Sequence, residues 1–386
     1  MKNETESTNI VCPPSVEFCL RLIGVWPGTS HAFSRKFLSI LSMVMFQICQ
    51  YQYVMKHFSK DNLLVLIDVL SVTMAYSLLL IKMTIFAFKS RLVDEMIASM
   101  IEDWKTRDVS EIYMMTRIAD ISRRFSNLII ACNAMSVFFY ATGTFFRHTN
   151  NNQTETRELL LKMEVPFTMD NIPVYVAILV TQFIHQTIAA SMTGMFNCVL
   201  ITLVLHVCGQ IDLVRRKLSE ITKKDIERQM TESIVKTLIV RHQRIIIFTK
   251  NIEALFSTIA LTQFISNTLI ICCLGFQIVI SIDAPDGTTM LVKSLVFYIA
   301  INTEAFIFCF AGEHLSKKSK MIGDAAYESL WYDLTPTQNR DLLFIIVRSQ
   351  KHLTLTIGRV MDLSLKQFTS IVKASASYVS VLHAMY

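Results

Sequence analysis

Charged residues are scarce in this chain. Asp, Glu, Lys and Arg make up 18% of its 386 residues, whereas a soluble domain usually carries about 25%. Hydrophobic residues make up 52%, and the mean hydropathy is +0.43. This balance excludes an ordinary soluble domain and favours a polytopic membrane protein built from several apolar spans.

Sequence motifs of catalysis and metal binding are absent as well. The chain has no Cys-x-x-Cys pair, no His-Glu-x-x-His motif, no Gly-x-Ser-x-Gly elbow and no P-loop. Its basic residues are scattered between the apolar runs and interleaved with acidic ones, which does not favour nucleic-acid binding. We therefore expect no enzyme, no metal site, no cofactor and no nucleic-acid partner.

We also expect no cleavable secretory leader. Residues 1–30 include charged side chains such as Glu17 and Arg21 and no apolar core of the length that a leader needs, so the first span is expected to remain uncleaved. The segment 16–27 is short and amphipathic and ends in Trp26-Pro27. Because Trp prefers the membrane interface, we expect an interfacial helix here.

Seven segments are apolar over about 20 residues or more, the length that crosses a bilayer. They are 36–55, 63–86, 126–146, 172–205, 254–281, 291–312 and 362–386. The last one is the least hydrophobic and carries several hydroxyl groups and Lys373. Such groups are costly in lipid, so they indicate a helix that lines water or packs closely on other helices. The predicted fold is all-α with seven transmembrane helices.

Lys and Arg in the connections set the orientation of these spans. The basic-rich connections are 87–125, 206–253 and 313–361, and the connections between them are poorer in Lys and Arg. Basic loops stay in the cytoplasm, so the N-terminus is predicted to be cytoplasmic and the C-terminus extracellular. The sequon at Asn152 falls in a loop predicted to be outside, where it is a candidate glycosylation site.

This orientation argues against a G-protein-coupled receptor, the alternative seven-helix class. Such a receptor has its N-terminus outside and carries a DRY-like box after its third helix and a proline motif in its seventh. Here the cytoplasmic end of the third span comes first, and the seventh span has no proline. A transporter would show broken helices in two related halves, whereas span six has no Gly or Pro near its middle and no internal repeat is found.

The cytoplasmic connections are themselves patterned as helices. Apolar residues recur at helical spacing through 206–250, which predicts that spans four and five continue as helices beyond the membrane. The segments 96–121 and 322–352 show the same pattern. Two possibilities stay open for the apolar stripes of these extensions: packing within one subunit, or a bundle shared between subunits.

Four ionisable side chains fall within the predicted spans. Lys82 is expected to extend to the cytoplasmic interface and Asp68 to reach water at the outer end. Glu304 and Lys373 lie deeper, where they form a pair or Lys373 faces an aqueous lumen. His185 is expected to be a hydrogen-bonded interior histidine, with a ligand contact as the alternative.

Several motifs of the C-terminal third resemble those of the insect odorant receptor family. They occur in the family's order: Phe308–Leu315 at the end of span six, the tyrosine and tryptophan segment Ala325–Tyr332, Arg340, and Ser370–Tyr378 in the last helix. In the family, span six ends in a Gly-containing turn. The run Gly24-Val-Trp-Pro27 is similar to receptors of ants, bees and wasps.

The resemblance implies a function and an assembly. Family members are odorant-gated, non-selective cation channels in the plasma membrane of olfactory neuron dendrites. An odorant-specific subunit forms a heterotetramer with a common co-receptor, and volatile organic ligands enter an outer pocket. The gustatory ending is absent, and the loop 206–253 is too short to hold the insertion of the co-receptor. The chain therefore resembles a ligand-tuning subunit.

The resemblance also suggests a division of the chain and its site residues. Residues 1–35 form the cytoplasmic N-terminus, 36–312 the first six helices with the pocket, 313–361 the cytoplasmic anchor helices and 362–386 the pore-lining helix. Val381 and Met385 match the family's gate positions, and Ser377 shares their helix face. Depth and side-chain type, not motif, suggest the odorant-binding residues Tyr76, Phe139, Thr142, Phe146, His185 and Tyr298.

Overall fold

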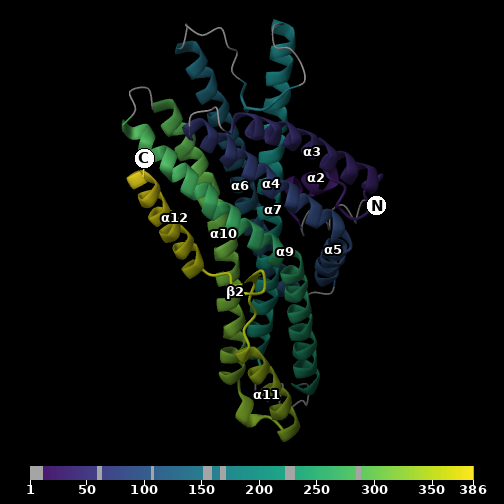
Figure 1. The fold of residues 1–386 in the computed structure, drawn as a ribbon. Coiled ribbons are helices and arrows are strands. Elements are labelled where there is room, and N and C mark those ends of the chain that lie inside the picture. The colour runs from purple at the N-terminus through teal and green to yellow at the C-terminus, as the bar shows by residue number, and fades with distance from the viewer. Residues whose placement is uncertain are drawn as a thin grey trace.

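The computed structural model of the chain describes residues 12–58, 63–105, 108–150, 159–165, 171–221, 231–283 and 288–385. These residues form an elongated helical bundle (Figure 1). Its elements are α2 (Pro14–Leu22), α3 (Ala32–His57), α4 (Leu63–Phe88), α5 (Ser90–Lys105), α6 (Val109–Asn150), α7 (Ile172–Ser219), α9 (Thr231–Asp283), α10 (Thr288–Tyr327), η1 (Trp331–Asp333), α11 (Pro336–Gln350), β1 (Thr356–Ile357), β2 (Met361–Asp362) and α12 (Leu365–Met385).

Each predicted span falls mainly within one long helix: α3, α4, α6, α7, α9, α10 and α12. Within the described part of the chain, five helices are long and apolar enough to cross a membrane: Ala32–His57, Val65–Phe88, Ile172–Ser219, Glu232–Ile282 and Met290–Tyr327. The prediction of an all-helical protein with several apolar spans is confirmed. That α6 and α12 also cross stays a prediction, because neither contains, among the described residues, a stretch as apolar as those five helices do.

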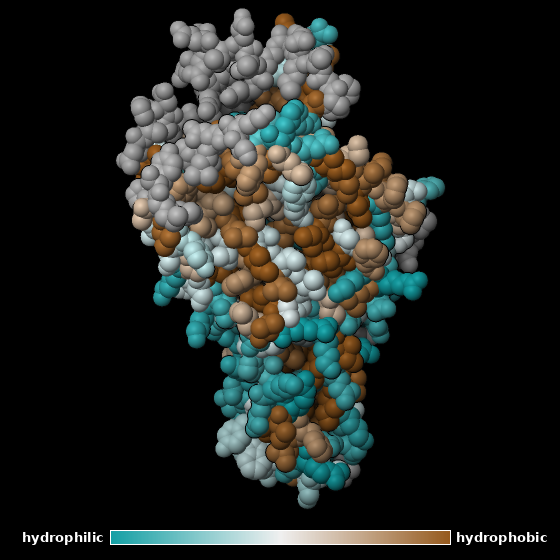
Figure 2. Space-filling model, in the orientation of Figure 1, coloured by the Kyte–Doolittle hydropathy of each residue, from teal (hydrophilic) through white to brown (hydrophobic). Residues whose placement is uncertain are grey.

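Helices α7 and α9 continue far beyond their apolar spans, as the periodicity predicted, and α10 does so too. Residues 109–125 of α6, 206–219 of α7, 231–253 of α9 and 313–327 of α10 run together with α11 into what we call the narrow extension. The rest of these helices and the other helices form the wide half (Figure 1). On the face shown in Figure 2, hydrophobic residues gather over the wide half and hydrophilic ones predominate over the extension. The wide half is therefore the part suited to lipid.

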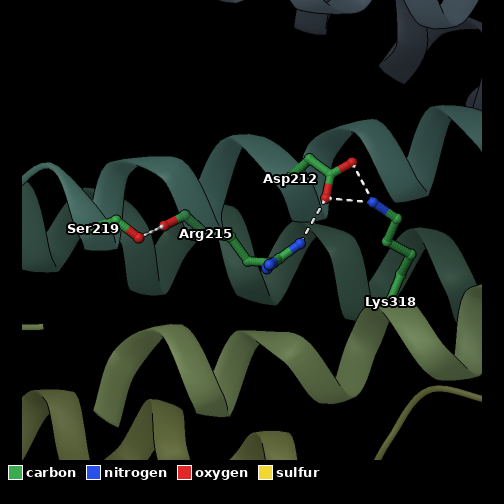
Figure 3. Close-up of polar contacts among 4 residues, drawn as sticks. All are labelled: Asp212, Arg215, Ser219 and Lys318. Carbon is green, nitrogen blue, oxygen red and sulfur yellow. Dashed lines mark hydrogen bonds and ion pairs between the residues drawn. The ribbon is translucent and has the colours of Figure 1, made fainter. Parts of the chain in front are cut away.

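The apolar stripes of the extension pack against one another within this single chain. The buried residues include Ile211, Leu218, Leu238 and Ile245, all of which belong to the main hydrophobic core. The ion pairs of Asp212 join two of the helices (Figure 3): Lys318 Nζ on α10 donates to both carboxylate oxygens at 2.7 and 2.8 Å. Arg215 Nη1 on α7 donates to the same carboxylate at 3.1 Å. Helix α11 begins with a capping box between Thr335 and Gln338 and with Pro336 in its first turn.

Helix α10 does not end at the glycine motif. It runs through Gly312 to Tyr327, so the expected Gly-containing turn at the end of span six is wrong. The glycine has a different role: a Cβ atom at this position would come within 2.5 Å of the Leu363 carbonyl oxygen. Gly312 therefore lets the segment that enters α12 press against the middle of α10.

A short hairpin that the sequence did not predict connects the extension to α12. Strands β1 and β2 pair antiparallel, with Gly358 and Arg359 at positive φ in the turn. The N–H of Gly358 donates to the carbonyl of Ser257 on α9 at 3.0 Å. At the other end of the chain, α2 forms where expected, but Trp26 is buried and not exposed to an interface, because the chain turns back at Gly24 with φ of 73°.

Candidate ligand cavity and pore helix

A cavity of about 600 Å³ lies between α4, α6, α7 and α10 in the wide half. Its walls are mainly aliphatic and aromatic, with a few polar groups between them. On α10 the lining residues extend from Lys293 to His314, a length of about 31 Å at 1.5 Å per residue. The cavity is thus elongated along the bundle, and its volume is typical of sites for small molecules, which span about 300–1,000 Å³.

Helical periodicity explains how four separate segments build one cavity. On α4 the lining residues include Val72, Tyr76 and Leu79, and on α7 they include Ala189, Thr193 and Asn197. Residues three and four apart share one face of a helix, so each helix contributes a single continuous stripe.

Two ion pairs connect α4 with α10 across this cavity. The deeper one joins Lys82 Nζ to Glu304 Oε1, and both side chains are almost fully buried. The ammonium also lies 5.6 Å from the ring centroid of Phe308. The expectation that Lys82 reaches the interface is therefore wrong, since its exposed fraction is 0%. Of the two alternatives for Glu304 and Lys373, the pair between them is wrong, because helix packing gives the buried Glu304 carboxylate Lys82 as its cation.

The second ion pair lies nearer the outer end. Lys293 Nζ donates to Asp68 Oδ2 at 2.7 Å, and both side chains are mostly buried. Asp68 was expected to reach water, but the structure gives it an ammonium partner from α10. Sequence reasoning placed charges in these spans without finding their partners, which lie 222 and 225 residues away.

The predicted odorant-binding residues are not all brought together. Tyr76 lines the cavity. His185 is buried beside it and stacks on Phe46 with ring centroids 3.7 Å apart. Its ring nitrogens have no hydrogen-bond partner among the described residues, so stacking replaces the expected hydrogen bonds. Its neighbour Gln186 lines the cavity instead.

The other predicted residues lie elsewhere or outside the description. Tyr298 packs against a second apolar cluster between α9, α10 and α12. Phe139 is 47% exposed on α6. Thr142 and Phe146 belong to α6, but their side chains lie outside the described residues, as does Asn152 altogether. The lining residues missed from the sequence follow from helical spacing: Leu79 and Lys82 come three and six residues after Tyr76.

Helix α12 has one covered and one uncovered face. Ile371 and Ser375 are buried, and the Ser375 hydroxyl donates to the Thr268 carbonyl on α9 at 3.4 Å. Ser377 and Val381 are exposed, Val381 at 58%. Met385 ends the helix, and its side chain lies outside the described residues.

Apart from that of Ser375, the hydroxyls of α12 are satisfied by the helix itself. The side chain of Ser377 donates to the Lys373 carbonyl at 3.1 Å, and Thr369, Ser370 and Ser380 donate in the same way to carbonyls four residues earlier. This pattern makes small hydroxyl residues tolerable in lipid and at helix contacts alike. Lys373, in contrast, is exposed on the uncovered side.

The fold and the cavity define a multi-pass helical membrane protein with a chamber for small molecules. Residues 62–376 match the family described as 7tm odorant receptor, and the chain belongs to that family. Its members are receptors and not enzymes, as the sequence predicted.

Individual relatives agree with this assignment. Odorant receptor 10 of Aedes albopictus is 26% identical over 307 residues, which cover 77% of this chain and 73% of the relative. Odorant receptor 13a of Drosophila melanogaster is 28% identical over 198 residues, so this match spans only 47% of each chain. The structure of the insect olfactory receptor OR5 from Machilis hrabei in complex with eugenol has a TM-score of 0.78, 14% identity, and coverage of 96% and 97% of the two chains. This last likeness establishes a shared fold.

Proposed function

We propose that this chain is the ligand-tuning subunit of an odorant-gated, non-selective cation channel. It crosses the plasma membrane seven times with a cytoplasmic N-terminus, forms a heterotetramer with a common co-receptor, and works in the dendrite of an olfactory neuron. The ligand is a small volatile molecule held in the cavity between α4, α6, α7 and α10. The related Machilis hrabei receptor was solved with eugenol, a compound of this size class.

The observation that carries the proposal is that α10 contacts both the cavity and α12. Ile301 lines the cavity and also belongs to the apolar cluster that contains Ile371 of α12. Phe306 lines the cavity and meets Phe368 of α12 edge to face, with ring centroids 5.7 Å apart. A ligand that shifts α10 therefore acts on α12 through direct packing.

The uncovered face of α12 supports its role as the pore helix. In the heterotetramer, this face and the corresponding faces of the other subunits surround one axis, and Val381 contributes to an apolar ring that closes the pore by excluding water. Met385 and Ser377 complete the same face. The anchor helices join the subunits, for which α11 offers Leu343, Phe344 and Val347, all of them exposed in the single chain.

Gating requires that the ligand bind the open arrangement more tightly than the closed one. A shift of the closed-to-open ratio from 99:1 to 1:99 takes about 5.5 kcal/mol of differential binding. Contacts between the ligand and the α10 wall supply this difference if α10 changes position between the two states.

Two variants test the proposal. Val381→Ser places a hydroxyl in the apolar ring, so the resting conductance of cells that express this chain with the co-receptor should rise several-fold; Val360→Ser, at an exposed residue of the hairpin, is the matched control. Phe368→Ala removes the ring contact with α10, so odorant-evoked current should fall while ligand binding is retained. Unchanged leak and unchanged evoked current in these variants would contradict the assignment of α12.

A further inference from the structure

We propose that Lys82, Glu304 and Asn197 form a polar subsite within the cavity that binds the hydroxyl end of a neutral amphiphile, such as a fatty alcohol. The inference rests on the proposed function, because it takes the cavity to be the ligand site. It adds the chemical class of that ligand, which cavity volume alone does not define.

The subsite lies midway along an otherwise apolar chamber. Glu304 is near the middle of the α10 stripe that extends from Lys293 to His314, and Lys82 reaches it from α4. Asn197 lines the cavity from α7, close to the level of Phe86. Its neighbour Phe196 packs on Phe86, one helical turn beyond Lys82, with ring centroids 4.6 Å apart. All three polar residues line the cavity.

Hydrogen-bonding capacity remains at this point of the wall. An ammonium carries three N–H donors and no acceptor. Among the described residues, Lys82 donates to one Glu304 oxygen and lies over the ring of Phe308. The Asn197 side-chain oxygen is buried with no hydrogen-bond partner in the described part of the chain, and the residue is only 2% exposed. A guest hydroxyl can accept from the ammonium and donate to an oxygen of the wall.

Charge selects a neutral guest. Lys82 and Glu304 compensate each other, so a third buried charge would lose its hydration without finding a free counter-ion. A carboxylate would compete with Glu304 for the ammonium. A pure hydrocarbon fits the aliphatic walls but leaves the polar groups unsatisfied. A hydrocarbon tail with one hydroxyl end matches both parts of the chamber.

The test measures binding, not current. The full-length chain is reconstituted in lipid nanodiscs, and nonane, nonanol and nonanoate displace the fluorescent probe N-phenylnaphthylamine. We expect nonanol to displace the probe at a concentration about tenfold lower than nonane does, with nonanoate weaker than nonanol. In the double variant Lys82→Met/Glu304→Leu, the advantage of nonanol over nonane should disappear. Lipid partitioning affects the original chain and the variant equally. The informative quantity is therefore the change, between the two, in the ratio of the nonane to the nonanol displacement concentration.

The double variant leaves no buried charge unpaired and is therefore expected to fold. Asn197→Leu is the second test and should also reduce the nonanol advantage. The matched control is Asp212→Asn/Lys318→Gln, which removes an ion pair of the extension outside the cavity lining and should keep the advantage.

An unchanged ratio in both subsite variants, or nonanoate as the tightest ligand, would overturn the inference. The proposed function fails separately: ligand binding with the expected ratio but no evoked current would refute the channel and leave the subsite standing.

Discussion

The wide half and the narrow extension use two of the same helices, α7 and α10, in opposite ways. In the wide half, α7 and α10, together with α4 and α6, stand apart around a cavity of about 600 Å³. In the extension, α7, α9 and α10 close on each other, and Ile211 and Leu218 of α7 are completely buried. The wide half therefore has internal space in which its helices can change position, whereas the closely packed extension resists deformation.

The ion pairs of the two regions also differ, in how far they are exposed to water. In the extension, ion pairs are partly hydrated and shared, as Asp212 is between Lys318 and Arg215 (Figure 3). In the wide half, Lys82 and Glu304 pair in nearly complete burial beside empty volume. Close packing resists displacement, so under the proposed gating we expect a ligand to shift the helices of the wide half relative to the closely packed extension.

The largest expected effect on stability comes from truncating leucines of α7 in the two regions. Leu218→Ala removes a fully buried side chain from the extension and should cost about 2–5 kcal/mol of unfolding free energy. Leu205→Ala, at a half-buried residue of the cavity wall, should cost about 1–2 kcal/mol, because the removed atoms border existing space. Thermal unfolding of the purified chain, followed by tryptophan fluorescence, compares the two. Equal losses would show that the two regions are packed alike.

A smaller effect should follow from neutralising the shared carboxylate of the extension. Asp212→Asn weakens the charged hydrogen bonds to Lys318 and Arg215 and should cost about 1.5–3 kcal/mol. A double-mutant cycle with Lys318→Met isolates the α7–α10 contact. Glu232→Gln, in an exposed pair with Lys236 on α9, is the control and should leave the melting temperature unchanged. An equal decrease in melting temperature in Asp212→Asn and Glu232→Gln would show that the Asp212 ion pairs stabilise the extension no more than an exposed pair does.

The smallest expected effect is a dependence of the extension on pH. Burial lowers the pKa of His242 on α9 below its ordinary value of 6.5, with the charge of Arg348 acting in the same direction. Since the unfolded chain binds the proton more readily, His242 contributes stability that is present above pH 6.5 and is lost as the pH falls below it. The melting temperature should therefore decrease below this pH, and His242→Gln should flatten the decrease. A slope that persists unchanged in the variant would exclude His242 as its source.

A second group extends this dependence to lower pH. Burial raises the pKa of Glu111, but the hydrogen bond and charge of Arg241 and the charge of Lys217 outweigh burial and hold it below the ordinary value of 4.5. Its contribution is present above pH 4.5 and is lost as the pH falls through the lowered pKa. Both groups therefore make acid loosen the extension.

Local pattern predicted much of the fold. Runs of about 20 apolar residues located the long helices, and the spacing of Ile211, Leu218 and Leu238 predicted the extension and its buried stripe. These features depend on near neighbours in sequence, which is why they were accessible. Ser377 and Val381 are exposed on α12 in the single chain, and their place at the pore stays a prediction.

Features that depend on the rotation of one helix against another were not accessible. Hydropathy places Lys82 in a span but does not say that it faces Glu304, and it does not separate Tyr76, which lines the cavity, from Phe139, which is exposed. In the sequence, Gly312 resembled a turn residue. The constraint that requires glycine there is the close approach of Leu363, which belongs to a distant segment and cannot be read from local pattern.

The central claim is that a ligand in the wide half opens a pore formed by α12. The most direct test records inside-out patches from cells that express this chain with the co-receptor, in solutions free of GTP, during application of a volatile panel that includes eugenol and nonanol. The account predicts an inward cation current that persists after excision and is reduced by Phe368→Ala. A response that appears only when GTP is supplied would contradict it and favour a G-protein-coupled mechanism.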